Sequence, residues 1–148
     1  VQHSILTGAD AAAFWRGYQQ SETDERWAFS FRLSALPADL DAVIKDINKL
    51  MPRACWGAHA ANGIVRIHGE EDLFEGLQTK RHPKFIAELR QAAQARGGQL
   101  VVLQAPQKIK DQLDTWGDVG QTATLMRELK RRFDPQAQLS PGRFVGGI

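Results

Sequence analysis

A strand-like alternation at residues 27–36 constrains the fold of this 148-residue chain more than any other feature. Apolar and polar side chains alternate along it, and successive side chains of a strand point to opposite faces of a sheet. This period of two therefore predicts a strand with one buried face. The apolar members of the run are Trp27, Phe29, Phe31 and Leu33.

Helix and hairpin signals follow the first strand. Pro37 begins a segment with apolar residues at three- and four-residue spacing, which predicts a helix that Pro52 ends. A second strand is expected at 53–60, and the Asn-Gly dipeptide at 62–63 is a strong hairpin signal. The run at 64–68 is then the returning strand.

A second helix and a last strand complete the pattern. Pro83 begins the helix, and Gly97 with Gly98 ends it, because glycine tolerates the left-handed conformation common after helices. The continuous apolar run at 100–103 predicts a central strand. The order strand, helix, strand, strand, helix, strand is that of the ferredoxin-like split βαβ arrangement. The predicted fold class is α+β, with a four-stranded antiparallel sheet that buries one face under two helices.

The chain divides into three segments that we expect to form one structural domain. Residues 1–26 contain a short amphipathic helix at 9–19 and a polar connector. Residues 27–104 form the ferredoxin-like part. Residues 105–148 add a C-terminal helix at about 119–133 and an irregular tail.

Composition and motifs exclude several classes of function. The net charge of +2 gives no electrostatic case for nucleic acid or an anionic membrane, and no apolar run approaches the roughly 20 residues that span a bilayer. Cys55 is the only cysteine, which excludes an internal disulfide and fits a cytoplasmic location. Neither a Gly-x-Gly-x-x-Gly nor a P-loop motif is present, so the chain lacks its own signature for FAD, nicotinamide or ATP.

The end of the chain carries the most specific motif. A basic amphipathic helix stops at a Phe-Asp-Pro sequence at 133–135, and Leu-Ser-Pro-Gly-Arg follows at 139–143. This pattern resembles the C-terminus of FAD-linked oxidases of the vanillyl-alcohol oxidase type. The strand that begins at Trp27 and the strand entry at Gly97-Gly98 also look like the glycolate oxidase FAD-binding-subunit branch of that family. In that family the turn lies near the cofactor and usually carries Asn where this chain has Ser140. The resemblance implies cofactor contacts in the parent enzyme from Ser140, Pro141, Gly142 and Arg143.

The hairpin carries a second resemblance to the same family. Members that act on D-2-hydroxy acids have two histidines here that help to hold a divalent metal beside the substrate. His59 matches the first histidine of the family's motif, and Asn62 matches its aspartate. Arg66 occupies the position of the second histidine. The later acidic ligand is replaced by the apolar stretch at 101–104, so we expect no metal. The resemblance implies substrate contacts from His59, Asn62 and Arg66, and an arginine suits a carboxylate.

Structural roles stay open for the same residues. His59 could be a hydrogen-bonded strand histidine, and Arg66 could pair with the acidic loop at 70–72. His68 and His82 are predicted to be surface or capping residues.

These features predict the C-terminal cap, or substrate, domain of an FAD-dependent oxidoreductase that acts on a 2-hydroxy acid such as glycolate or a related alcohol. No catalytic residue is identified. A flavin-binding domain, expected before Val1 or in a partner chain, would hold the FAD, so the isolated chain should bind no FAD and be inactive. The apolar tail and Trp116 are expected to form a docking face, with self-association as another use.

Two alternatives remain open at this point. One is an accessory subunit that docks on a partner flavoprotein. The other is a free-standing ferredoxin-like binding module. An RNA-binding module is disfavoured, because RNA-recognition sheets stack bases on exposed aromatic residues and the strand at 64–68 has none.

Overall fold

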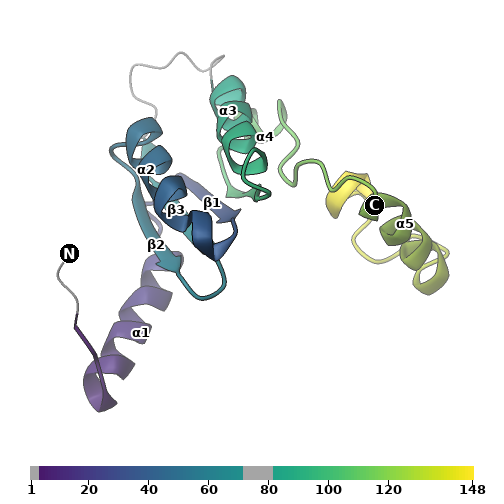
Figure 1. The fold of residues 1–148 in the computed structure, drawn as a ribbon. Coiled ribbons are helices and arrows are strands. Elements are labelled where there is room, and N and C mark those ends of the chain that lie inside the picture. The colour runs from purple at the N-terminus through teal and green to yellow at the C-terminus, as the bar shows by residue number, and fades with distance from the viewer. Residues whose placement is uncertain (1–3, 72–81) are drawn as a thin grey trace.

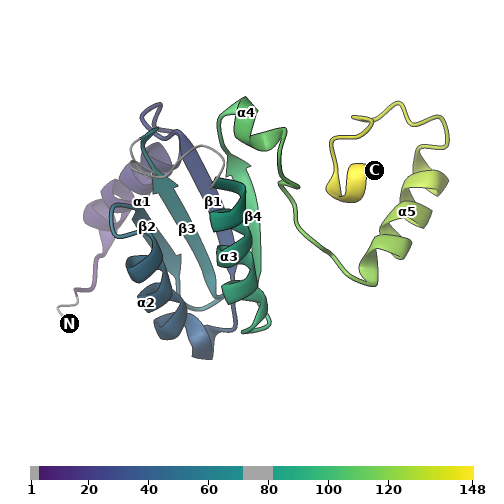
Figure 2. The same ribbon diagram turned by 90° about the horizontal axis from the view of Figure 1, so that it is seen from above.

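The computed structural model describes residues 4–71 and 82–148 and has an α+β fold. The four described strands form one antiparallel sheet in the order β2-β3-β1-β4 (Figure 2). Helix α2 (Leu40–Leu50), which a 3-10 turn at Pro37–Asp39 precedes, follows β1, and α3 (His82–Gln94) lies between β3 and β4 in sequence. This order confirms the predicted split βαβ arrangement. The strands are β1 (Phe29–Ser34), β2 (Cys55–His59), β3 (Ile64–Gly69) and β4 (Gln99–Gln104).

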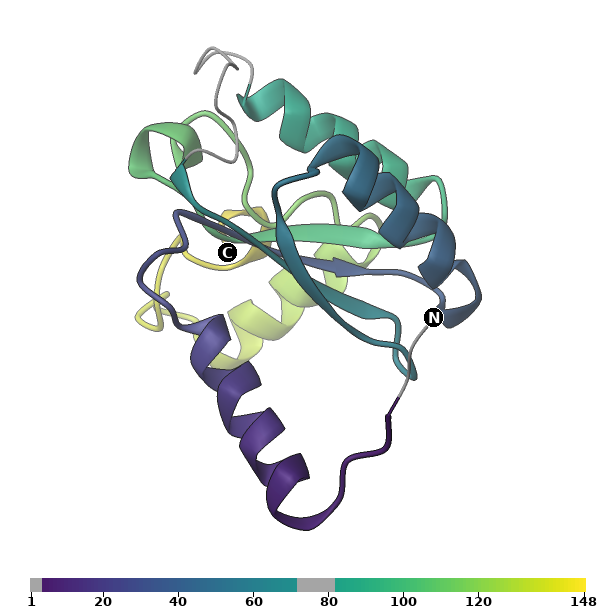
Figure 3. The same ribbon diagram turned by 90° about the vertical axis from the view of Figure 1, so that its left-hand side faces the viewer.

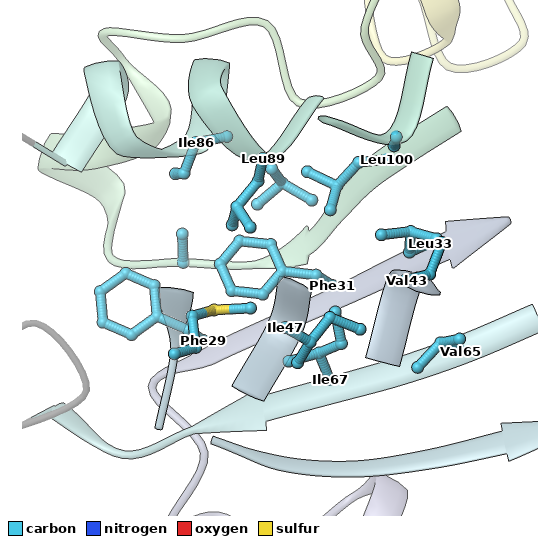
Figure 4. Packing of buried hydrophobic residues seen from close by; sticks show 14 of the residues in the cluster. Phe29, Phe31, Leu33, Val43, Ile47, Val65, Ile67, Ile86, Leu89 and Leu100 are labelled. Atoms are coloured by element: carbon cyan, nitrogen blue, oxygen red, sulfur yellow. The ribbon is translucent and has the colours of Figure 1, made fainter. Parts of the chain in front are cut away.

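The core lies between the sheet and a layer formed by α2 and α3 (Figure 3, Figure 4). Phe29, Phe31 and Leu33 of β1 point into it and are no more than 3% exposed, which confirms the buried face predicted from the alternation. Their burial supplies most of the hydrophobic stabilisation of the central strand. The facing residues are Leu40, Val43 and Ile47 of α2, Ile86, Leu89 and Ala93 of α3, Val65 and Ile67 of β3, and Leu100 and Val102 of β4.

The second face of the sheet is partly covered as well, so the prediction of a single buried face is incomplete. Helix α1 (Gly8–Glu22) lies on this face, opposite α2 and α3 (Figure 3). Trp27, which was predicted to share the core face, precedes β1 and stacks on His68 of the second face, with ring centroids 5.5 Å apart. Ser30 is consequently buried although the alternation marks it as polar.

The prediction of a central strand at 100–103 is wrong, because β4 lies at the edge of the sheet and pairs with β1 but with no other described strand. Its apolar run has a different cause. Helix α3 covers one face, and the chain returns along the open edge, where the Val102 amide donates a hydrogen bond to the Thr115 carbonyl at 2.8 Å. Leu100, Val101 and Val102 are therefore buried without a strand on each side, whereas Leu103 is 47% exposed.

A tight connection links the β2–β3 hairpin to β1. The amides of Asn62 and Gly63 both donate to the His59 carbonyl, and the Ala35 amide donates to the Gly63 carbonyl at 2.9 Å. Gly63 has a φ of +67°, and a Cβ built there would lie 1.9 Å from the Ala35 carbonyl oxygen. Only glycine fits this position. Most of the predicted polar loop after β3, residues 72–81, lies outside the described residues.

The C-terminal segment extends away from the core (Figure 1, Figure 2). After a short helix α4 (Gln107–Lys110), helix α5 (Thr122–Phe133) begins three residues later than predicted and buries none of its residues. The chain ends in a 3-10 turn, η4 (Val145–Gly147). In the part of the chain that the structure describes, no helix is long and apolar enough to cross a membrane.

Candidate functional site

His59 and Arg66, two of the three predicted substrate residues, share the sheet face that α1 covers. Arg66 pairs with Gly57, two residues before His59, and side chains two residues apart on a strand point to the same face. The Trp15 ring of α1 stacks on the His59 imidazole at 5.8 Å between centroids, and the Tyr18 ring meets its edge at 5.5 Å. The fold therefore gathers aromatic and basic side chains between α1 and the hairpin.

Gly57 allows this close packing of α1 on β2. A Cβ built at Gly57 would lie 3.1 Å from the nearest carbon of the Tyr18 ring, closer than side chains normally approach. The absent side chain lets the ring lie against the strand backbone.

Glu22, at the end of α1, supplies the acidic group of the cluster. Its carboxylate lies 3.5 Å from Arg66 Nε through Oε2 and 3.6 Å from His68 Nε2 through Oε1. Oε1 is buried and accepts no hydrogen bond from the described residues. Burial raises the pKa of the nearby Tyr18 hydroxyl, and the hydrogen bond to Glu22 and its negative charge raise it further. Arg66 therefore pairs with Glu22, and the predicted alternative of a pair with the acidic loop is not what the described residues show.

Asn62 lies apart from this cluster, in the hairpin turn. Its side-chain Oδ1 accepts a hydrogen bond from the Ile64 amide at 3.2 Å, a local bond that supports the turn. The structure thus brings together two of the three predicted substrate residues and gives the third a turn-forming contact.

His68 is a buried residue, so its prediction as a surface or capping histidine is wrong. It is 6% exposed, and its Nδ1 lies 3.0 Å from Ser30 Oγ. Burial lowers the pKa of its imidazole, although the charge of Glu22 acts in the opposite direction. The period-two pattern of β3 offered the missing signal, since it places His68 on the same face as Arg66. The matching prediction for His82 concerns a side chain outside the described residues.

Ser30 contacts His68, and His68 contacts Glu22, in the same spatial order as the nucleophile, base and acid of a hydrolase triad. Ser30 is only 4% exposed, and the Trp27 ring covers His68. A nucleophilic hydroxyl must reach its substrate, so we assign this row no catalytic role.

The predicted cofactor residues form an exposed turn at the other end of the molecule (Figure 1, Figure 2). The Arg143 amide donates to the Ser140 carbonyl at 3.2 Å, and Gly142 has a φ of +72°. Pro followed by Gly at the two central positions is the signature of a type II turn. Ser140 itself has a φ of +47°, a conformation that Asn tolerates better than Ser. The structure does not bring this turn and the His59–Arg66 face together.

An open apolar groove of about 400 Å³ lies between α5 and the tail. The side chains around it are exposed: Leu129 by 47%, Phe133 by 76% and Phe144 by 50%. Phe144 packs edge-on against Trp116 at 5.3 Å, and Trp116 Nε1 donates to the Arg143 carbonyl. We call this surface the α5–tail face. It consists of Leu125, Met126, Leu129, Phe133, Leu139, Phe144 and Ile148.

Asp134 holds the tail against α5. Its carboxylate accepts hydrogen bonds from the amides of Gln138 and Leu139, at 2.8 and 2.9 Å, and lies 2.6 Å from Lys130 Nζ. The bond from Lys130 and the backbone bonds lower the pKa of Asp134 to about 2. Its carboxylate therefore stabilises the folded tail at every pH above the unfolded value of 3.8, and this contribution is lost as the pH falls through about 2.

We expect Asp134→Asn to loosen the tail while the core stays intact. The amide NMR signals of Gln138 and Leu139 should move toward random-coil positions, and in the wild type the Asp134 carboxyl should titrate near pH 2. Asp41→Asn is the matched control, because Asp41 also pairs with a lysine four residues away but is itself exposed and far from the tail in sequence. A wild-type midpoint near 3.8, or equal tail signals in both variants, would contradict this account.

Among residues 4–71 and 82–148, no three His, Cys, Asp or Glu side chains are grouped so that they could hold a metal ion. Comparison with known proteins adds no assignment: no protein-family model matches the chain, and no curated protein matches it.

Proposed function

We propose that this chain is the C-terminal cap, or substrate, domain of an FAD-dependent oxidoreductase that acts in the cytoplasm on a 2-hydroxy acid such as glycolate or a related alcohol. FAD, when bound, accepts the hydride equivalent from the substrate C–H bond. The residues of this chain would orient the substrate and complete the wall of its pocket.

The exposed α5–tail face is the observation that carries the proposal. Helix α5 is amphipathic yet buries no residue, and its apolar residues continue onto the tail. A contiguous apolar surface of this kind marks a binding site for another protein surface. The same segment carries the motif that resembles the flavin oxidases, which is why we propose the flavin-binding domain as its partner.

The exposed turn at 140–143 supports a cofactor contact that is shared with the partner domain, but not a complete cofactor site on this chain. All four of its residues are exposed, so they do not enclose a cofactor by themselves. Arg143 provides a guanidinium that suits a phosphate or carboxylate held by the partner domain.

The His59–Arg66 face supports recognition of an acid substrate. The Arg66 side chain is 29% exposed and lies on the same sheet face as His59, on which the Trp15 ring of α1 stacks. A guanidinium beside an imidazole and aromatic rings has the donors and the apolar contacts that a small hydroxy acid requires.

The test is Leu129→Ser in the full-length protein that contains this chain. We expect a lower ratio of bound FAD to protein and slower oxidation of glycolate, because a polar side chain weakens docking of the α5–tail face. Leu36→Ser is the matched control, since Leu36 is a similarly exposed leucine, at 58% against 47%, outside that face. A full-length protein without flavin, or equal flavin content in both variants, contradicts the proposal.

The accessory-subunit alternative rests on the same face. It differs in where the flavin domain is encoded: in a second gene rather than in the same reading frame. Copurification of a separate flavoprotein with this chain, lost with Leu129→Ser, would support that alternative.

A further inference from the structure

The contact between Glu22 and Arg66 is long for an ion pair whose side chains are only half-buried, at 23% and 29% exposed. Hydrogen bonds between charged nitrogen and oxygen atoms are normally about 2.7–2.9 Å long. Here Arg66 Nε lies 3.5 Å from Glu22 Oε2, and the guanidinium makes no hydrogen bond with any residue in 4–71 or 82–148. Arg66 therefore retains the capacity to bind both oxygens of another carboxylate.

The other oxygen of Glu22 is in an unfavourable position. Oε1 is buried without a hydrogen-bond partner among the described residues, and burial lowers the pKa of the facing His68 imidazole, which disfavours its charged form. A buried acceptor without a partner costs free energy. Release of Glu22 into water would recover that cost, although it would also break the hydrogen bond between Tyr18 and Glu22.

Helix α1 is also weakly held. It buries no residue completely, and its N-terminal half extends beyond the sheet (Figure 3). Its contacts with the sheet come from its C-terminal half, through Trp15, Tyr18 and Glu22. A helix attached in this way can leave the sheet without opening the core between the sheet and the other helices.

We propose that the C-terminal half of α1 is a displaceable cover on an anion site at Arg66, and that the Glu22 carboxylate occupies the place of a small carboxylate ligand. Glu22 is thus an internal competitor for the site. The ligand class, a hydroxy acid, rests on the proposed function, but the site itself follows from the geometry. The stacked Trp15 and His59 rings would form the wall beside the ligand.

The test is titration of the 148-residue chain with glycolate at fixed ionic strength, followed by NMR at the Arg66 side chain. Glu22→Gln should tighten glycolate binding about tenfold, which corresponds to about 1.4 kcal/mol, because the competing charge is gone. Glu25→Gln is the control, since Glu25 is exposed and lies three residues further on. In the Glu22→Gln background, Arg66→Gln should abolish binding.

A second measurement uses the wild-type chain and so does not depend on how the variants fold. Glycolate should speed amide hydrogen exchange in the C-terminal half of α1 and leave that of α2 unchanged. Equal affinities for Glu22→Gln and Glu25→Gln, binding that survives Arg66→Gln, or unchanged exchange in α1 would each overturn the proposal.

The outcomes separate this inference from the proposed function. If the full-length protein lacks flavin but Glu22→Gln binds glycolate more tightly, the anion site is supported and the oxidoreductase function is refuted. If the full-length protein is a flavoprotein that oxidises glycolate but Glu22→Gln does not raise the affinity for glycolate, the oxidoreductase function is supported and the displaceable cover is refuted.

Discussion

Phe31→Ala should lower the free energy of unfolding by about 3–5 kcal/mol, the range for removing a large aromatic side chain from a packed core. Phe31 is fully buried at 0% exposure on β1, with strands on both sides. Removal of its ring leaves a cavity between the sheet and the helix layer that rigid strands cannot close. Since whole domains are stable by only about 5–15 kcal/mol, the variant should be close to unfolded.

Urea unfolding followed by circular dichroism measures this effect. Phe133→Ala is the matched control, because it makes the same chemical change at a side chain that is 76% exposed on α5. We expect its stability to stay within about 0.5 kcal/mol of wild type, as for most surface changes. Similar losses in the two variants would show that the core does not lie where the structure places it.

Gly63→Ala should be the second severe change, with a loss of more than about 3 kcal/mol. Two costs add at this position. An alanine in the left-handed region costs about 1–2 kcal/mol, and its Cβ would collide with the Ala35 carbonyl oxygen at 1.9 Å. The collision must break the Ala35–Gly63 hydrogen bond and move the hairpin that carries His59 and Arg66.

Gly97→Ala separates these two costs. Gly97 has nearly the same φ, +66°, but a Cβ there meets no atom within 4 Å. It should lose only the conformational part, about 1–2 kcal/mol. Thermal melts of the two variants give the difference, and NMR of His59 should show a disturbed stack with Trp15 only in Gly63→Ala. Equal melting temperatures would show that the hairpin relaxes without cost.

The α5–tail face and the His59–Arg66 face lie at opposite ends of the molecule. The first would hold a partner and the second a substrate, so changes at one should be separable from changes at the other. If the proposed function holds, Leu129→Ser should therefore lower flavin content in the parent protein and leave glycolate binding by the 148-residue chain unchanged.

The amino-acid sequence by itself determined the elements and their order. The alternation at Phe29, Phe31 and Leu33 marked the central buried strand, and the dipeptide at 62–63 marked the hairpin. These signals are local, because the period of a strand and the conformational preferences of glycine act within a few residues. They were sufficient for the split βαβ arrangement and for placing His59 and Arg66 on one hairpin.

Only the tertiary structure decided what covers each face. The run at 100–103 has the composition of a central strand, yet β4 lies at the edge, because α3 and the returning chain at Thr115 supply the burial that a neighbouring strand would otherwise provide. Composition reports that a segment is buried but not which segment buries it. For the same reason, the sequence did not predict that Glu22 lies beside Arg66 and His68. These contacts depend on α1 lying across the second face of the sheet. No local pattern encodes a contact between residues more than 40 positions apart.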